Sequence, residues 1–234
     1  MATLPLRAGS GCHRVVLLAP ASAPAAAATA AAAAAAPPNS FPAPVYPANF
    51  VGRDEETSGS WLGTYGLAGY VLIAYDGVNA TVAALPPWVA SVEQRVDSAD
   101  NGPWLLPPSG ADPRALADPR NVSASRRVGQ YGTRPHTPTF AVDVAAASAA
   151  PGTTHQFAFY FVDFDDLGRR QTVQLMDGVT LEDISPPVLL GPPDFVGGVW
   201  LVWQYPRSVR LRINEVRGGS GVLSAIAFDD VPAS

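Results

Sequence analysis

The chain has 234 residues, of which 47% are hydrophobic, so it is long enough for one sizeable core or two small ones. Its net charge is −5, and no basic stripe that could follow phosphates is present, so we do not expect a nucleic-acid partner. The single cysteine, Cys12, lies near the N-terminus, which excludes a disulfide framework or a thiolate metal site in the rest of the chain.

The first 51 residues have the composition of a targeting leader followed by an Ala- and Pro-rich linker. No Asp or Glu precedes Asp54, and Arg7 and Arg14 stand ahead of an apolar stretch and a long Ala tract. This pattern favours a secretory signal peptide and a secreted protein; an organellar transit peptide or an untargeted linker are the alternatives. The Ala tract is too short and too weakly apolar to span a bilayer. We expect residues 1–51 to be disordered or cleaved and residues 52–234 to form the folded domain.

Short apolar stretches separated by turn residues follow the leader. The stretch 70–75 ends in a turn signal and predicts a strand. The stretch 80–94 predicts one strand, or two strands broken at Pro86 and Pro87, at a sheet edge because Pro cannot donate to the ladder. A polar loop is expected at 97–114, and loops of this length tend to be functional or disordered.

The C-terminal half contains the most regular strand patterns. In 155–162 and 197–205 the residues at both alternate sets of positions are apolar, which indicates strands that are buried on both faces. In 208–216 the apolar residues alternate with polar ones, among them Arg210 and Arg212. That alternation indicates a strand with one face in a core and the other in water.

Further strands are expected at 126–132, at 139–147 with Asp143 turned outward, and at 221–230. The whole chain then has about nine strands and no helix. Hairpin-linked strands with one wet face are antiparallel more often than parallel. We therefore predict a single all-β domain, an antiparallel β-sandwich of jelly-roll type, preceded by the disordered leader.

Several separated motifs also occur in an order that resembles a known module. They are Trp61, the stretch 65–70, the stretch 112–116, Asp163 with Asp165 and Arg169, and Gly198 with the stretch 201–203. Together they cover about 180 residues and resemble the accessory module found at the ends of secreted bacterial glycoside hydrolases, including α-L-rhamnosidase-like proteins. The resemblance implies a jelly-roll carbohydrate-binding domain. The chain departs from the family where GGSGVLS (218–224) replaces a tail that often holds a polar Asn.

Aromatic side chains are the first candidates for a sugar site. Trp61, Tyr65 and Tyr70 could stack on a sugar ring, although the core beside a Gly-rich bend is the favoured alternative for all three. Trp88 and Trp104 lie in Pro-rich stretches, where a large aromatic ring has fewer core partners, and they are the better exposed candidates. Arg170 is a candidate for hydrogen bonding to sugar hydroxyls.

A cluster of three carboxylates, Asp163, Asp165 and Asp166, follows the strand at 155–162 and could bind calcium. The spacing does not fit a helix-loop-helix calcium loop, because Leu167 stands where that loop needs a third ligand. The favoured alternative is an ion pair of one Asp with Arg169 or Arg170 and a turn capped by another. Calcium is the one cofactor that the sequence suggests.

Signals for hydrolysis are weak. Beyond the leader the histidines are His136 and His155, and neither a GxSxG nor an HExxH motif occurs. Asp163 and Glu182 could cleave a glycoside only if their carboxyl groups lie roughly 5–9 Å apart. We therefore do not expect an enzyme, and a glycoside hydrolase is the third hypothesis.

Two sequons, at Asn79 and Asn121, fall in expected loops and are candidate N-glycosylation sites. The leading functional prediction is a non-catalytic carbohydrate-binding accessory domain whose partner is a glycan or polysaccharide. The alternative is a structural or adhesion domain that binds another protein.

Overall fold

The computed structural model describes residues 45–95, 102–107, 110–133, 139–147 and 153–231. The leader predictions for 1–44 and one of the two histidines beyond the leader, His136, lie outside these residues. The described elements are β1 (Asn49–Asp54), β2 (Gly69–Gly77), β3 (Ala80–Ala84), β4 (Val89–Arg95), β5 (Gly102–Leu105), β6 (Gly129–Gly132), β7 (Thr139–Ala146), β8 (His155–Phe161), β9 (Arg170–Asp177), β10 (Val188–Leu190), α1 (Asp194–Gly197), β11 (Val199–Tyr205), β12 (Val209–Arg217), β13 (Val222–Leu223) and β14 (Ala225–Asp230).

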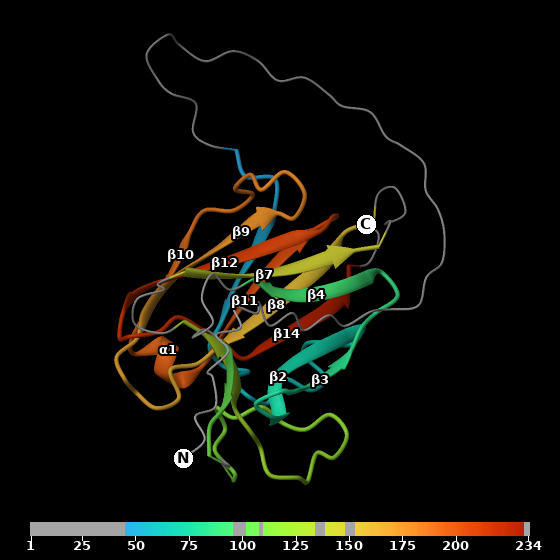
Figure 1. Cartoon of the computed structure of the whole chain (residues 1–234). Helices are drawn as coiled ribbons and strands as arrows, with labels where there is room; N and C mark the ends of the chain where they lie inside the picture. Colours follow the sequence, from blue (N-terminus) through green and yellow to red (C-terminus); the bar gives the residue numbers. More distant parts are fainter. Residues whose placement is uncertain (1–44, 96–101, 108–109, 134–138, 148–152, 232–234) are drawn as a thin grey trace, which may run out of the picture.

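Two antiparallel sheets pack face to face (Figure 1). The six-stranded sheet has the order β1-β11-β8-β14-β2-β3, and the five-stranded sheet has the order β10-β9-β12-β7-β4. From β7 to β9 and from β10 to β12 the chain crosses between the sheets at nearly every step, and early strands pair with late ones, as β2 does with β14 and β7 with β12. This connectivity is that of a jelly roll. The predicted antiparallel β-sandwich is confirmed.

The strand faces agree with the alternation in the sequence. β8 lies between β11 and β14 and is buried on both faces, and β11 is buried likewise between β1 and β8. Trp200 and Trp203 point to opposite faces of β11, and both are fully buried. β12 buries alternate residues and leaves the intervening ones partly in water. The predicted burial patterns of β8, β11 and β12 are therefore all confirmed.

Two apolar clusters share the six-stranded sheet. The larger one, which we call the main core, fills the space between the two sheets and includes Phe157, Phe159 and Phe161 of β8. The smaller one lies on the opposite, outer face of the six-stranded sheet, around Tyr160 and Trp200. Two irregular segments, 57–68 and 110–128, pack on this outer face; we refer to them together as the cover. The five-stranded sheet turns its outer face away from both clusters.

The element count and some boundaries differ from the prediction. The described residues hold fourteen strands and one short helix rather than about nine strands, because several are very short, such as β13 and β10. β1 begins at Asn49, before the expected start at Gly52, because Asn49 pairs with Gln204 of β11. The stretch 80–94 forms two strands broken at the prolines, β3 and β4, and each is an edge strand as predicted. The expected loop at 97–114 contains β5, which pairs with β6.

Candidate functional site

Trp61 and Tyr65 do not form an exposed platform. The side chain of Trp61 is 1% exposed, and its Nε1 donates a hydrogen bond of 3.1 Å to the Ala117 carbonyl oxygen. Tyr65 is buried against Trp200, and its hydroxyl donates to the Asp54 carboxylate at 2.7 Å. A buried ring has no free face for a sugar, so the stacking prediction is wrong for both residues and the core alternative is confirmed.

Trp88 and Trp104 each keep part of their surface in water. Trp88 stacks on His155 with ring centroids 3.8 Å apart, and its Nε1 donates to Asp230 at 2.9 Å. Trp104 packs against the main core beside Gly132, where an added Cβ would come 2.0 Å from the Trp104 ring. Both rings therefore use one side for packing, and their role in binding remains a prediction.

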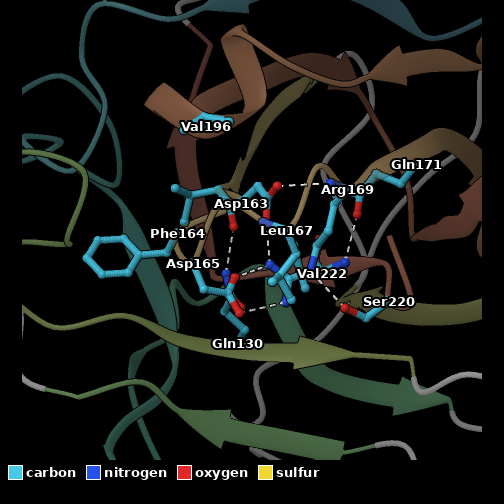
Figure 2. A network of polar contacts seen from close by, with 12 residues as sticks. Gln130, Asp163, Phe164, Asp165, Leu167, Arg169, Gln171, Val196, Ser220 and Val222 are labelled. Atoms are coloured by element: carbon cyan, nitrogen blue, oxygen red, sulfur yellow. Dashed lines mark hydrogen bonds and ion pairs between the residues drawn. The ribbon is translucent and has the colours of Figure 1, made fainter. Parts of the chain in front are cut away.

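The aspartate cluster is organised around an arginine (Figure 2). Asp163 is fully buried, and both Asp163 and Asp165 form ion pairs with Nη1 of the buried Arg169. Asp163 also accepts hydrogen bonds from the backbone amides of Leu167 and Arg169, which closes the turn. The ion-pair alternative is confirmed: Arg169 supplies the cation between these two carboxylates.

The remaining polar contacts support the same interpretation. Arg169 Nε donates to Ser220 Oγ at 2.8 Å, and Asp166 is exposed on the turn. Although burial alone would lower the pKa of Arg169, its two carboxylate partners raise it above its ordinary value. Within the described ranges, no group of three or more His, Cys, Asp or Glu side chains is arranged to hold a metal ion.

The proposed hydrolytic pair is not brought together. Asp163 pairs with Arg169 at the start of β9, whereas the Glu182 carbonyl accepts from the Asp177 amide at its other end. The eight residues of β9 separate these ends by about 20 Å. The hypothesis that Asp163 and Glu182 flank a glycosidic bond is therefore wrong.

The outer side of the five-stranded sheet is lined by polar side chains from four adjacent strands. We call this surface the polar face. Its outward residues are Glu93 and Arg95 of β4, Thr139 and Asp143 of β7, Arg210, Arg212 and Asn214 of β12, and Thr172 and Gln174 of β9. The residues between them on β7, β9 and β12 point into the main core.

Ion pairs and hydrogen bonds cross the polar face from strand to strand. Asp143 accepts from Arg210 Nε at 2.6 Å and from Arg95 Nε at 2.8 Å. Burial alone would raise the pKa of Asp143, but these two guanidinium groups lower it below its ordinary value. Arg212 donates to Gln174 and, at 3.2 Å, to Asp183. The polar face thus presents planar groups in fixed orientations.

Arg170 is exposed at the start of β9, on the same side of the sheet as the polar face. Arg170 was a candidate from the sequence, where aromatic rings were the leading candidates, but the polar face was not predicted as a site. The available signal was the alternation in 208–216 together with the outward Asp143.

Asn79 and Asn121 are both exposed and lie in turns. Arg120, next to Asn121, pairs with Asp76 of β2 at 2.6 Å, which brings the two sequon turns side by side. Both belong to the layer formed by the six-stranded sheet and the cover. In the part of the chain that the structure describes, no helix is long and apolar enough to cross a membrane.

No family model matches the chain, and no curated protein matches its sequence. Solved structures that are similar in part include the following three. The N-terminal CBM22-1 and GH10 modules of an endo-1,4-β-D-xylanase from Clostridium thermocellum, complexed with xylohexaose, match 73% of this chain and 29% of that chain, with 8% identity and a TM-score of 0.37. The enzymatically active domain of tailspike protein 4 of bacteriophage CBA120 matches 60% and 19%, with 9% identity and a TM-score of 0.33.

An exo-β-1,3-galactanase from Phanerochaete chrysosporium, with galactose, matches 63% of this chain and 30% of that chain, with 17% identity and a TM-score of 0.29. The chain thus spans 30% or less of each of these three proteins. The xylanase and the galactanase act on carbohydrates, and an α-L-rhamnosidase-like protein is not among the three. TM-scores this low carry no argument about function.

Proposed function

We propose that the protein is a secreted, non-catalytic carbohydrate-binding domain that holds a glycan on its polar face. The observation that carries this proposal is the difference between the two outer sheet faces. The cover buries the outer face of the six-stranded sheet, whereas the polar face offers Arg95 and Arg212 with 56% and 34% of their side chains exposed.

The chemistry of the polar face suits sugar hydroxyl groups. Guanidinium, carboxylate and amide groups are planar and can bind two neighbouring hydroxyls at once, as donors, as acceptors or as both. Arg95 already pairs with Glu93 and Asp143, and Arg210 pairs with Asp143, so less conformational entropy is lost when a ligand binds. A row of such groups across four strands suits an extended chain rather than a single ring.

A matched pair of arginine variants tests the proposal. Arg212 on the polar face and Arg53 on β1 have 34% and 31% of their side chains exposed, and each pairs with a carboxylate. We expect Arg212→Met to weaken polysaccharide retention in affinity gel electrophoresis by at least about tenfold, while Arg53→Met leaves it unchanged. Thermal unfolding of both variants checks that they are folded.

The other outcomes are equally informative. Equal loss in both variants would place binding away from the polar face and contradict the assigned site. If no polysaccharide slows the migration of the folded wild-type protein, carbohydrate binding is contradicted. Binding of another protein without binding of any polysaccharide would contradict it as well. Release of reducing sugar from a bound polysaccharide would contradict the non-catalytic part of the proposal.

A further inference from the structure

Two arginines face each other at one end of the polar face. Arg170, the first residue of β9, and Arg217, the last residue of β12, are register partners in the antiparallel pair. Directly opposed residues in such a pair have Cβ atoms about 5 Å apart, and like charges at that distance destabilise the sheet. Both side chains are exposed. A pair of this kind gains stability when an anion lies between its members.

Neither arginine has a partner of its own among the described residues, in contrast to the rest of the arginines there. All others in those ranges donate to a carboxylate or a carbonyl oxygen: Arg53, Arg95, Arg114, Arg120, Arg126, Arg127, Arg169, Arg207, Arg210 and Arg212. In a chain with net charge −5, two opposed arginines without a carboxylate are unusual.

The neighbouring acidic groups are already engaged. Asp163 and Asp165 pair with Arg169, and Glu215 of β12 accepts a hydrogen bond from the Gly219 amide at 2.8 Å. The surrounding turns contribute glycine rather than bulky side chains. Gly191 lies against Arg170, where an added Cβ would come 3.2 Å from Cγ, and Gly218 and Gly219 follow Arg217. A side chain at position 191 would crowd Arg170, whereas a Cβ added at Gly219 would meet no atom within 4 Å. Because both arginines are exposed, a ligand can reach the pair from the solvent side.

From this arrangement we infer that Arg170 and Arg217 form an anion subsite and that the glycan held by the polar face is acidic. Two guanidinium forks match the oxygen geometry of a uronic acid carboxylate or a sulfate ester. The subsite continues the polar face, since Arg170, Thr172 and Gln174 alternate outward along β9. The identity of the ligand rests on the proposed function, whereas anion binding by the pair does not.

The test compares polysaccharides that differ only in charge. Polygalacturonate and its fully methyl-esterified form test the carboxylate; a sulfated galactan and its desulfated form test the sulfate. We expect the full-length protein to bind one acidic member at least about tenfold more tightly than its neutral counterpart. The double variant Arg170→Gln/Arg217→Gln loses this preference, and Arg53→Gln keeps it. At about 1 M NaCl, where the Debye length is about 3 Å, the wild-type preference also falls.

A second measurement separates this inference from the proposed function. Sodium sulfate, at an ionic strength matched with NaCl, should raise the melting temperature of the wild type more than that of the double variant. Glycan binding that depends on Arg212 but shows no charge preference would overturn the acidic ligand and leave the proposed function standing. A sulfate effect without glycan binding would retain the anion subsite and overturn the proposed function. No sulfate effect and no charge preference would overturn the inference altogether.

Discussion

The pair formed by Asp163 and Arg169 shows how one buried charge determines a local structure. Asp163 is fully buried, so its carboxylate depends on Arg169 and on two backbone amides for the hydrogen bonds that water would otherwise supply. Asp165 contacts the same guanidinium from the surface, with 37% of its side chain exposed. The two carboxylates differ in burial and therefore in how much stability each contributes.

Replacing the buried partner should be far more costly than replacing the exposed one. Removing one member of a buried ion pair typically costs about 3–5 kcal/mol, so we expect Asp163→Asn to lower the free energy of unfolding by about 3 kcal/mol. Asp165→Asn should lower it by less than about 1 kcal/mol, because exposed pairs contribute little. Urea denaturation measures both values. Equal losses in the free energy of unfolding would show that the buried Asp163 carboxylate stabilises the protein no more than the exposed Asp165 carboxylate does.

His155 makes stability depend on pH. Its side chain is 3% exposed, neither ring nitrogen has a hydrogen-bond partner, and Nδ1 lies 3.6 Å from Asp230. Burial lowers the pKa of His155 below 6.5, and the Asp230 carboxylate opposes part of that shift. The unfolded chain therefore binds a proton more readily than the folded protein. The contribution of His155 is fully present above pH 6.5 and is lost as pH falls from 6.5 to the folded pKa.

An NMR titration of the His155 ring checks this expectation. In the folded protein the pKa should lie below 6.5, and Asp230→Asn should lower it further, because the opposing carboxylate is gone. Urea denaturation near pH 5.5 and near pH 7.5 should show less stability at the lower pH, and His155→Phe should reduce that difference. A folded pKa above 6.5 would mean that Asp230 outweighs burial.

At the scale of elements, the cover depends on backbone contacts at a very short distance. Gly59 donates to the Pro113 carbonyl and accepts from the Ala117 amide, and an added Cβ would come 2.0 Å from the Ala115 carbonyl oxygen. Gly59→Ala should therefore push the two halves of the cover apart and cost roughly 1–3 kcal/mol. Hydrogen exchange should show faster exchange in 110–128 than in β8. Gly197→Ala, at a glycine with open space around it and no positive φ, is the steric comparison.

The cover also shows where prediction from sequence stops. Alternation along β8, β11 and β12 was sufficient to assign buried and wet faces, because period-two patterning is a local property of a strand. The second apolar face of β8 and β11 indicated that something covers it. The sequence did not show that the segment with Trp61 does so, because the contact of Trp61 with Ala117 joins residues 56 positions apart.

The difference between local strand patterning and long-range contacts also explains why the candidate site could be predicted only in part. The outward positions of Asp143, Arg210 and Arg212 could be predicted strand by strand, but their meeting depends on the order β12-β7-β4. The opposition of Arg170 and Arg217 depends further on a shift in register between Glu215 and Arg217. A β-bulge of this kind changes which residues face each other and has no reliable signature in the sequence.

At the scale of the whole molecule, the two sheets separate two kinds of surface. The polar face belongs to the five-stranded sheet. The sequon asparagines Asn79 and Asn121 lie in the other layer, in turns that Asp76 and Arg120 hold together. Glycans attached there would extend from the covered side and leave the polar face free. Glycosylation and ligand binding are therefore expected to be independent.

We expect the full chain, produced by a eukaryotic host with its own N-terminal segment, to be secreted with glycans on Asn79 and Asn121. Treatment with an N-glycosidase should lower its mass in two steps, and Asn79→Gln and Asn121→Gln should each remove one step. Polysaccharide binding should be the same before and after treatment, because both sites lie in the layer opposite the polar face. Secretion without a glycan would contradict the use of the sequons. A variant in which a known signal peptide replaces the first 44 residues tests the leader. If this variant is glycosylated and the natural chain is not, the sequons can accept glycans but the natural N-terminal segment does not direct secretion. That result would contradict a secretory leader.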